Sequence, residues 1–282
     1  MGLLVDKVAV VTGAGNGLGR SHALVLAREG ARVVVNDPGC ARDGSGRSDV
    51  ADEVVEEIRA AGGEASTSKV AVGSFEAAGQ LVQEAVQAFG GVDVLVNNAG
   101  ILRDRTALKM SEEEWAPVIA VHLTGTFSCL QAAARAMREQ GRGGRIINTT
   151  SVAGMQGNFG QSNYAAAKAG IYALTRTAAM ELQRYGITVN AISPTAYTRM
   201  TSDNPGVTEA FGVRYGPQHV SPLVAFLASD EAADITGQTF GIEGTHIFAY
   251  RMMSTVGAKQ HVGDEPWKPA AIRHVIGQVM NG

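Results

Sequence analysis

The chain has little of what marks several classes of protein. It contains only two cysteines, Cys40 and Cys129, so no disulfide framework can form and a reducing, cytoplasmic compartment is expected. No apolar run approaches the ~20 residues that a membrane span needs. A net charge of -3 gives no electrostatic reason to expect nucleic acid or an anionic membrane as a partner. These absences favour a soluble protein that acts on a small molecule.

What the sequence does contain is enough apolar material for one large core. Its 282 residues are 45% hydrophobic and 18% charged, which fits one α/β domain. Short β-branched runs alternate with helix-length segments, and this alternation predicts a single-domain, Rossmann-type, doubly wound parallel sheet. The seven runs that should form its strands are 7–12, 32–36, 65–71, 92–97, 145–149, 188–192 and 239–242.

The domain boundaries follow from where this alternation ends. We assign residues 1–245 to this Rossmann-type domain, with residues 195–217 as a lid. Residues 246–282 read as an irregular C-terminal extension, rich in Pro, Gly and His, that packs on the same domain.

Three local signals describe the connections between the predicted elements. Residues 38–48 are rich in Gly, Arg and Asp and predict an exposed loop. Ser111 followed by Glu114 predicts a capping box at the start of a helix. Pro117 lies six residues further along than Ser111, so this helix is either kinked or begins late.

A glycine-rich segment, residues 12–19, follows the first strand and opens a helix. Glycines allow a tight turn and the close approach of the backbone to a pyrophosphate, and the helix N-terminus supplies N–H donors. A purely structural glycine turn is the alternative, but a strand on one side and a helix on the other favour cofactor binding. The predicted cofactor-binding residues of this segment are Gly13, Asn16, Gly17, Leu18 and Gly19.

Asp37 ends the second predicted strand. A carboxylate there can accept hydrogen bonds from both adenosine ribose hydroxyls and repels a 2′-phosphate, so it favours NAD over NADP. The alternative is a turn-forming residue before Pro38. Arg42 and Arg47 in the following loop could also reach a phosphate.

Ser151, Tyr164 and Lys168 form the candidate catalytic group. The tyrosine and lysine are four residues apart, so both leave one face of a helix, and the serine follows the strand 145–149. A tyrosine with its reference pKa of ~10 is a poor base, and a nearby ammonium lowers that pKa. Tyr164 would then take the proton of an alcohol whose oxygen Ser151 holds, while Lys168 also binds the nicotinamide ribose. A core tyrosine with a snorkelling lysine is the alternative, and no metal site is predicted.

Together with residues 97–100 (Asn-Asn-Ala-Gly) and 194–198, these motifs make the chain similar to the short-chain dehydrogenase/reductase family over roughly residues 5–245. The resemblance implies an NAD-dependent oxidoreductase acting on CH–OH groups. It also implies a homodimer or homotetramer assembled through the helices before and containing the Tyr–Lys pair. The further cofactor contacts that it implies are Val72, Asn97, Ala99, Gly100, Tyr164, Lys168, Pro194 and Thr198.

Three positions depart from the common family pattern. His122 stands where the family usually has an Asn that holds a water linking the lysine to solvent. A histidine could take this relay role, with a titration near pH 6–7, or could be a satisfied core residue. Ala71 replaces an Asp that often contacts adenine, and Thr195 replaces a Gly after the proline.

Several stretches resemble a narrower group. Residues 36–39, 98–105, 121–123 and 157–164 are similar to the (3R)-hydroxyacyl-CoA dehydrogenase module of peroxisomal type-2 multifunctional enzymes, here as a stand-alone protein. This resemblance implies lipid metabolism, with a fatty or steroid 3-hydroxyacyl-CoA oxidised to the 3-oxoacyl-CoA. The alternatives are a 17β-hydroxysteroid dehydrogenase, a 3-oxoacyl-carrier reductase and a non-enzymatic dinucleotide-sensing scaffold.

Overall fold

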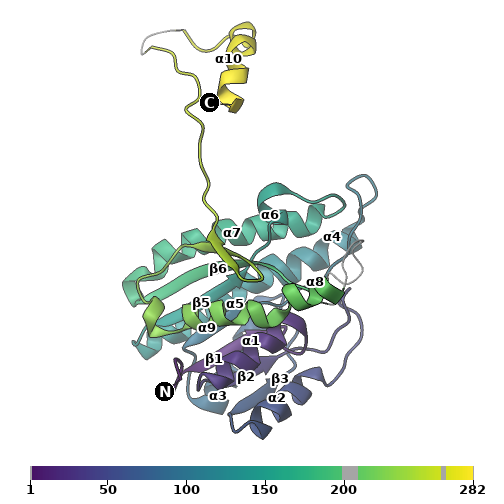
Figure 1. Ribbon diagram of the computed structural model, residues 1–282, viewed down its shortest axis with the longest axis vertical. Helices are drawn as coiled ribbons and strands as arrows, with labels where there is room; N and C mark the ends of the chain where they lie inside the picture. The colour runs from purple at the N-terminus through teal and green to yellow at the C-terminus, as the bar shows by residue number, and fades with distance from the viewer. Residues whose placement is uncertain (1, 199–208, 262–264, 282) are drawn as a thin grey trace. The chain divides into compact units, whose positions relative to one another are not determined.

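The computed structural model describes residues 2–198, 209–261 and 265–281, and a central sheet dominates it (Figure 1). The strand order is β3-β2-β1-β4-β5-β6-β7-β8. Neighbouring strands from β3 to β7 run parallel, and β8 is antiparallel to β7. The strands are β1 (Val8–Thr12), β2 (Arg32–Asn36), β3 (Ala65–Ser68), β4 (Val94–Asn97), β5 (Gly144–Thr149), β6 (Ile187–Thr195), β7 (Thr239–Glu243) and β8 (His246–Ala249).

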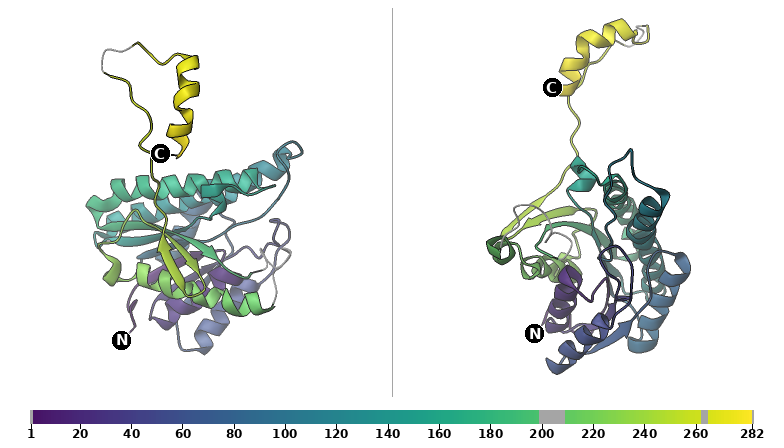
Figure 2. Two further views of the ribbon diagram at one scale, coloured as in Figure 1. Left: turned by 45° about the horizontal axis from the view of Figure 1, so that its top comes forward. Right: turned by 90° about the vertical axis from the view of Figure 1, so that its right-hand side faces the viewer.

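Helices cover both faces of the sheet, as Figures 1 and 2 show. One face packs against α1 (Gly17–Arg28), α2 (Val50–Ala60) and α9 (Ser221–Ala228). The other packs against α3 (Phe75–Phe89), α5 (Gly125–Gln140) and α7 (Ser162–Leu182). Alternate residues of one strand enter opposite cores, so both faces must be apolar and the strands read as continuous Val, Ile and Leu runs.

Shorter elements complete the catalytic unit. The capping box of Ser111 and Glu114 forms as predicted and opens α4, which contains Pro117 and runs directly into a π-helical turn. The remaining short elements are α4 (Glu112–Ile119), η1 (Ala120–Thr124), α6 (Ala153–Gln156), η2 (Gln183–Tyr185), α8 (Glu209–Arg214), η3 (Pro217–His219) and η4 (Asp230–Ala232).

The predicted fold class is confirmed, and the structure adds one strand to the seven parallel strands. β8 returns from β7 through the two-residue turn Gly244-Thr245, and the φ of 59° at Gly244 suits such a hairpin. The sequence placed these residues in the extension because a four-residue strand is too short to show a clear alternation. The predicted sheet therefore ended one strand too early.

The chain divides into two compact units, Met1–Ala249 and Tyr250–Gly282. The second unit is not wholly irregular, as the sequence suggested, because it contains helix α10 (Pro269–Asn281). Thr255 Oγ1 donates to the carbonyl of Val279 at 2.7 Å and holds the segment before the helix against it. The packing of this extension on the catalytic domain stays a prediction.

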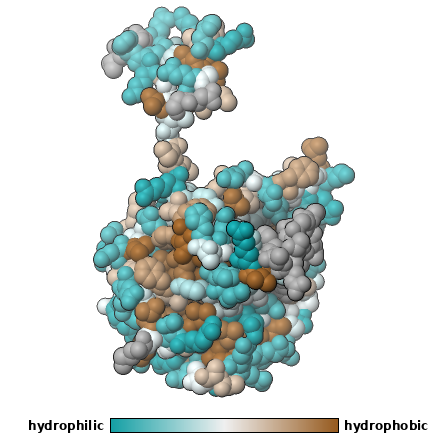
Figure 3. Space-filling view, in the orientation of Figure 1, coloured by the Kyte–Doolittle hydropathy of each residue, from teal (hydrophilic) through white to brown (hydrophobic). Residues whose placement is uncertain are grey.

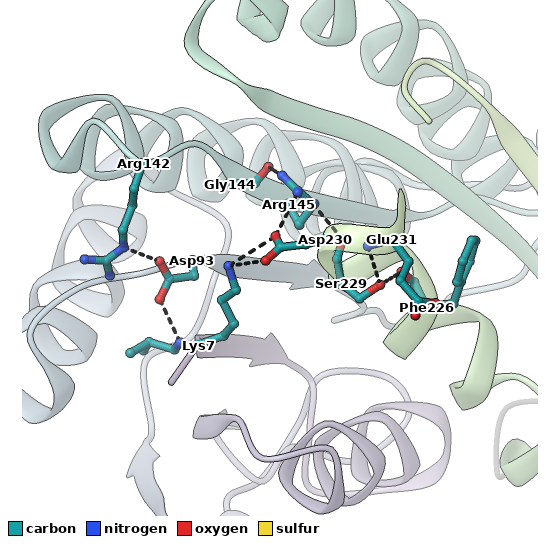
Figure 4. A network of polar contacts seen from close by, with 10 residues as sticks. Lys7, Asp93, Arg142, Gly144, Arg145, Phe226, Ser229, Asp230 and Glu231 are labelled. Atoms are coloured by element: carbon teal, nitrogen blue, oxygen red, sulfur yellow. Dashed lines mark hydrogen bonds and ion pairs between the residues drawn. The ribbon is translucent and has the colours of Figure 1, made fainter. Parts of the chain in front are cut away.

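Ion pairs tie together the amino-terminal ends of three strands (Figure 4). Asp93, next to β4, accepts a hydrogen bond from the backbone N–H of Val8 at 2.8 Å and from Arg142 Nε at 2.7 Å. Asp230 pairs with Lys7 Nζ at 3.1 Å and with Arg145 NH2 at 3.0 Å. This edge of the sheet is thus closed by opposite charges.

One helical stretch among the described residues has the length and composition of a membrane span. Hydrophobic residues are interspersed with hydrophilic ones on the face drawn in Figure 3. The continuous helical stretch Glu112–Gln140 is long and apolar enough to span a bilayer by length and composition alone. Core helices of soluble domains meet the same criteria, and the α5 part of this stretch packs against α3.

Candidate active site

A cavity of about 280 Å³ opens where the carboxyl ends of the central strands meet, the usual place for a ligand in a doubly wound sheet. The connections after β1, β2, β3 and β4 contribute to its wall. Nine of the residues predicted to bind cofactor line it: Gly13, Asn16, Gly17, Leu18, Asp37, Val72, Ala99, Gly100 and Thr198.

The glycine segment after β1 fits closely against the turn after β4. Gly13 has a φ of 65°, and a Cβ there would lie 2.7 Å from the Cα of Ala99. A Cβ on Gly19 would overlap the carbonyl oxygen of Gly13. Gly19 therefore brings helix α1 close to the turn, and it lies outside the cavity lining, so the cofactor contact predicted for it stays a prediction.

Asp37 places a buried carboxylate in the cavity wall at the end of β2. Its Oδ2 accepts a hydrogen bond from the backbone N–H of Gly15 at 2.9 Å, and its Oδ1 accepts one from Gly39 at 2.7 Å. Asp37 is 6% exposed, and both of these hydrogen bonds come from backbone N–H groups. The glycine cradle and this carboxylate together suit a dinucleotide.

The loop after β2, residues 38–48, is mostly exposed, as expected, and it also forms part of the cavity wall. Cys40, Ala41, Gly44 and Arg47 line the cavity, as does Arg103 from the segment after β4. The glycines and the Asp of this loop predict turns. No local sequence pattern could show which distant residues the loop contacts.

Ser151, Tyr164 and Lys168 come together as the sequence predicted. Tyr164 and Lys168 lie in the first two turns of α7, with Lys168 Nζ 5.5 Å from the centroid of the tyrosine ring. Lys168 is 3% exposed and donates to the carbonyl of Thr149, at the end of β5, at 2.6 Å. Ser151 follows β5, and its side chain lowers the pKa of Tyr164.

The pKa of Tyr164 shifts in the direction opposite to the one expected. Burial raises the pKa of Tyr164, a hydrogen bond with Ser151 opposes this, and the charge of Asp104 adds to it. Burial also lowers the pKa of Lys168 to about 7. The prediction of a lowered tyrosine pKa counted the lysine charge and left out desolvation, so its direction is wrong for this structure.

His122 lies in the π-helical turn η1, at the edge of the tyrosine ring. The two ring centroids are 5.1 Å apart and the ring planes are perpendicular. His122 Nε2 lies 2.8 Å from the carbonyl oxygen of Ile101 and 3.1 Å from its backbone nitrogen. Burial, assisted by the charge of Lys168, lowers the pKa of His122 to about 3. The expectation of a titration near pH 6–7 is therefore wrong, and the imidazole stays neutral.

Two further predicted contacts lie outside the cavity lining. Asn97 is buried in β4, where its amide donates to Asn148 Oδ1 at 2.9 Å. Pro194 is paired with Ile242 inside the sheet. Both hold the strands that carry the site, and neither they nor Tyr164 and Lys168 are among the lining residues of this cavity.

The predicted lid falls partly outside the described residues, because residues 199–208 are not described. In the described part, Tyr197 N donates to the carbonyl of Tyr215 at 2.7 Å, so the two ends of the lid segment are joined. Within the described part of the chain, no group of three or more His, Cys, Asp or Glu could hold a metal ion.

A doubly wound sheet with a glycine cradle, a buried aspartate and a Ser–Tyr–Lys group defines a dinucleotide-dependent oxidoreductase. The sequence model of the short chain dehydrogenase family matches residues 7–205, and the chain belongs to this family, whose members typically depend on NAD or NADP. It is therefore a short-chain dehydrogenase/reductase acting on hydroxyl or oxo groups.

Two curated relatives and one solved structure locate the chain within the family. It is 48% identical to the hydroxyacyl-CoA dehydrogenase ChsB1 of Mycobacterium tuberculosis over 86% of this chain and 79% of that one. It is 46% identical to a 3-oxoacyl-[acyl-carrier-protein] reductase of Synechocystis, covering 86% of this chain and 98% of the relative. The full-length peroxisomal multifunctional enzyme type 2 of Drosophila melanogaster is 36% identical with a TM-score of 0.80; the match covers 98% of this chain and 46% of that enzyme. The similarity to type-2 multifunctional enzymes is thus confirmed.

Proposed function

We propose that this protein is an NAD-dependent dehydrogenase that oxidises a 3-hydroxyacyl-CoA, of a fatty acid or a steroid side chain, to the 3-oxoacyl-CoA. The observation that carries the proposal is the group of Ser151, Tyr164 and Lys168 at the carboxyl end of β5, beside the dinucleotide cavity. A dinucleotide-sensing scaffold would have no use for these three side chains in contact.

Asp37 supports NAD as the cofactor. Its carboxylate lines the cavity and accepts hydrogen bonds from the neutral backbone N–H groups of Gly15 and Gly39, so a 2′-phosphate beside it would meet a negative charge. Gly13, Gly17 and the N-terminus of α1 would hold the pyrophosphate. Ala99 and Gly100 would border the cofactor on the other side of the cavity, with Thr198 a further contact.

In the proposed reaction the alcohol loses a proton to Tyr164 and a hydride to the cofactor. The nicotinamide, when bound, supplies the hydride acceptor. Ser151 donates a hydrogen bond to the substrate oxygen and Tyr164 accepts its proton. Because burial raises the pKa of Tyr164, a positive charge is needed nearby to favour the phenolate, and Lys168 is placed to supply it. His122 holds the turn that shapes this pocket and stays neutral.

The substrate class is supported by the relatives. Two of them carry the names of enzymes acting on hydroxyacyl-CoA or 3-oxoacyl carriers, which undergo the same alcohol–ketone interconversion at carbon 3. The reductase direction is the second candidate, because the Synechocystis relative is a reductase. Asp37 disfavours it, since biosynthetic reductases usually use NADPH.

The test is a panel of initial rates with NAD and NADP. The substrates are (3R)- and (3S)-hydroxyacyl-CoA esters of several chain lengths, a steroid-CoA and a free 17β-hydroxysteroid. We expect NAD reduction with one 3-hydroxyacyl-CoA enantiomer and little with NADP. A preference for NADPH in the reverse direction would replace the proposal by the reductase, and turnover of the free steroid alone would replace it by a 17β-hydroxysteroid dehydrogenase.

We also propose a cytoplasmic homodimer or homotetramer. Helices α5 and α7 leave a surface groove of about 350 Å³ whose apolar members include Phe127, Leu130 and Leu174. A second copy related by a two-fold axis would cover the same groove on both subunits. Analytical ultracentrifugation of the full chain tests this, and Leu174→Glu should shift a dimer or tetramer toward a smaller species. A monomeric wild-type protein would refute it.

A further inference from the structure

The loop between β2 and α2, residues 39–48, is shaped by hydrogen bonds within the loop itself. The backbone N–H of Ala41 donates to the carbonyl of Ser45 at 2.7 Å, and the Ser45 hydroxyl donates to Asp43 Oδ1 at 2.7 Å. At its base, the Ser48 hydroxyl donates to the carbonyl of Gly39 at 3.0 Å. A loop with these bonds has a defined shape even though most of its residues are exposed.

Two hydrogen bonds fasten the tip of this loop to the segment that follows β4. The backbone N–H of Leu102 donates to the carbonyl of Arg42 at 2.9 Å, and Arg103 Nε donates to the carbonyl of Asp43 at 2.9 Å. Gly44, at the tip, lies over Ile101, because a Cβ on Gly44 would be 3.3 Å from the Ile101 side chain. Of these two hydrogen bonds, only the one from Arg103 is donated by a side chain.

The guanidinium of Arg103 is itself held by a backbone carbonyl of α4. Pro117 has no N–H, so it cannot donate to the carbonyl of Glu113, four residues earlier in the helix. Arg103 NH1 donates to that carbonyl instead, at 2.6 Å. The Arg103 side chain therefore bonds both the carbonyl that Pro117 leaves without a helical donor and loop 39–48. Both Arg103 and Pro117 line the cofactor cavity.

We propose that Arg103 is a positioning residue that fixes loop 39–48 as the outer wall of the adenosine end of the cofactor cavity, and that cofactor affinity depends on it. This inference rests on the proposed function, which places the adenosine ribose at Asp37, the residue from which the loop starts. A fixed wall spares the cofactor the conformational entropy of ordering the loop on binding.

The same residue explains why the effect should fall on binding and not on the chemical step. The backbone carbonyl of Arg103 accepts a hydrogen bond from Asn163 Nδ2 at 2.9 Å, and Asn163 is the buried residue directly before Tyr164. A substitution of the Arg103 side chain keeps this carbonyl, so the first turn of α7 stays anchored. Loss of the guanidinium therefore separates the loop from the catalytic helix.

The experiment compares R103M with R103K and with the matched control R105M in the full-length protein. Arg105 lies two residues further along, and its side chain pairs with Glu114 of α4 at 2.8 Å instead of with the loop. We measure the Kd for NADH by its fluorescence, KM and kcat, and the rate of trypsin cleavage after Arg47, an exposed loop residue.

For R103M we expect an increase in the NADH Kd of about tenfold, equal to about 1.4 kcal/mol, from the loss of two charge-assisted hydrogen bonds. We expect kcat at saturating NAD within about twofold of wild type, because only ground-state binding is weakened. Trypsin should cleave R103M after Arg47 faster than it cleaves the wild type, and NADH should protect this peptide bond less. R103K should recover part of both effects, since one ammonium can reach one of the two carbonyls. R105M should behave as wild type.

The possible failures can be told apart. Unchanged affinity and unchanged cleavage in R103M would overturn the inference. Weaker NADH binding with unchanged cleavage would show a direct contact with the cofactor and would also overturn it. If the wild type binds no NADH, the proposed cofactor is wrong. The cleavage rate then decides alone whether Arg103 holds the loop, while its role in cofactor affinity is refuted.

Discussion

The two ends of the parallel sheet differ in how their charged side chains are partnered. At the amino-terminal end, Asp93 and Arg142 neutralise each other, and Asp230 pairs with two cations. At the carboxyl end, Lys168 is 3% exposed, and it donates a hydrogen bond to the neutral carbonyl of Thr149. Asp37 likewise accepts hydrogen bonds from the neutral backbone N–H groups of Gly15 and Gly39.

This difference separates a stabilising edge from a reactive one. A buried charge without an opposite charge costs stability, and it is kept only where its reactivity is used. The lowered pKa of Lys168 is a sign of that cost. Substitutions at the amino-terminal end should therefore change stability and leave turnover unchanged, and substitutions of the reactive groups at the carboxyl end should lower turnover.

The largest effect on turnover is expected for Tyr164→Phe. Loss of the proposed base should lower kcat by about 10²–10⁴-fold. The unfolding free energy should change little, because the ring and its packing are kept. Tyr172→Phe, on the same helix, is the matched control and should keep turnover. Turnover in Tyr164→Phe equal to wild type would refute the assigned mechanism.

The opposite result is expected for Asp93→Asn at the other end of the sheet. The amide keeps the shape of the carboxylate but loses its charge to Arg142, and it can satisfy only one of the two donors on its former oxygens. We expect a loss of about 2 kcal/mol in unfolding free energy, with kcat unchanged below the transition. Urea unfolding monitored by circular dichroism measures the first, and initial rates measure the second. Lower kcat without destabilisation would break the comparison.

Lys168→Met tests the cost of the unpaired charge through the pH dependence of stability. Burial lowers the pKa of Lys168 from 10.5 to about 7, so the folded protein releases this proton earlier than the unfolded chain does. Between these values the unfolded state binds more protons, and the contribution of Lys168 to stability rises with pH. Relative to wild type, the variant should therefore be most stable below pH 7, with its advantage shrinking toward pH 10.5.

Thermal unfolding of both proteins over this range measures the effect. A difference in Tm that stays constant with pH would show that Lys168 bears no such cost. Asp93→Asn has no reason to show this dependence in the same window, so it serves as the control from the stabilising edge.

The fold and the centre of the site could be predicted from the sequence, because the sequence patterns that signal them are periodic or local. Seven strands followed from apolar runs, and Tyr164 and Lys168 share a helical face because of their four-residue spacing. The wall formed by loop 39–48 could not be predicted, because Arg103 meets Asp43 across sixty residues of sequence. The pKa directions of Tyr164 and His122 were missed for a related reason: desolvation depends on the packing around a residue and leaves no local pattern.

The smallest effect at the reactive edge is expected for His122→Asn. His122 Nε2 faces both the carbonyl and the N–H of Ile101, but one ring nitrogen can either donate to the first or accept from the second. An Asn amide carries a separate donor and acceptor and can serve both, so the turn η1 should keep its shape and kcat should stay within about tenfold. His122→Ala, which has neither group, should lower kcat further.

The pH profile of this variant decides the role of the ring. Because burial lowers the pKa of His122 to about 3, the imidazole is neutral throughout pH 5–8 and cannot contribute an ionisation there. The profiles of kcat/KM for wild type and His122→Asn should therefore have the same shape over this range. A limb near pH 6–7 that is present in the wild type and absent from the variant would show that His122 exchanges protons during turnover. The reactive edge would then contain a second titrating group beside Lys168.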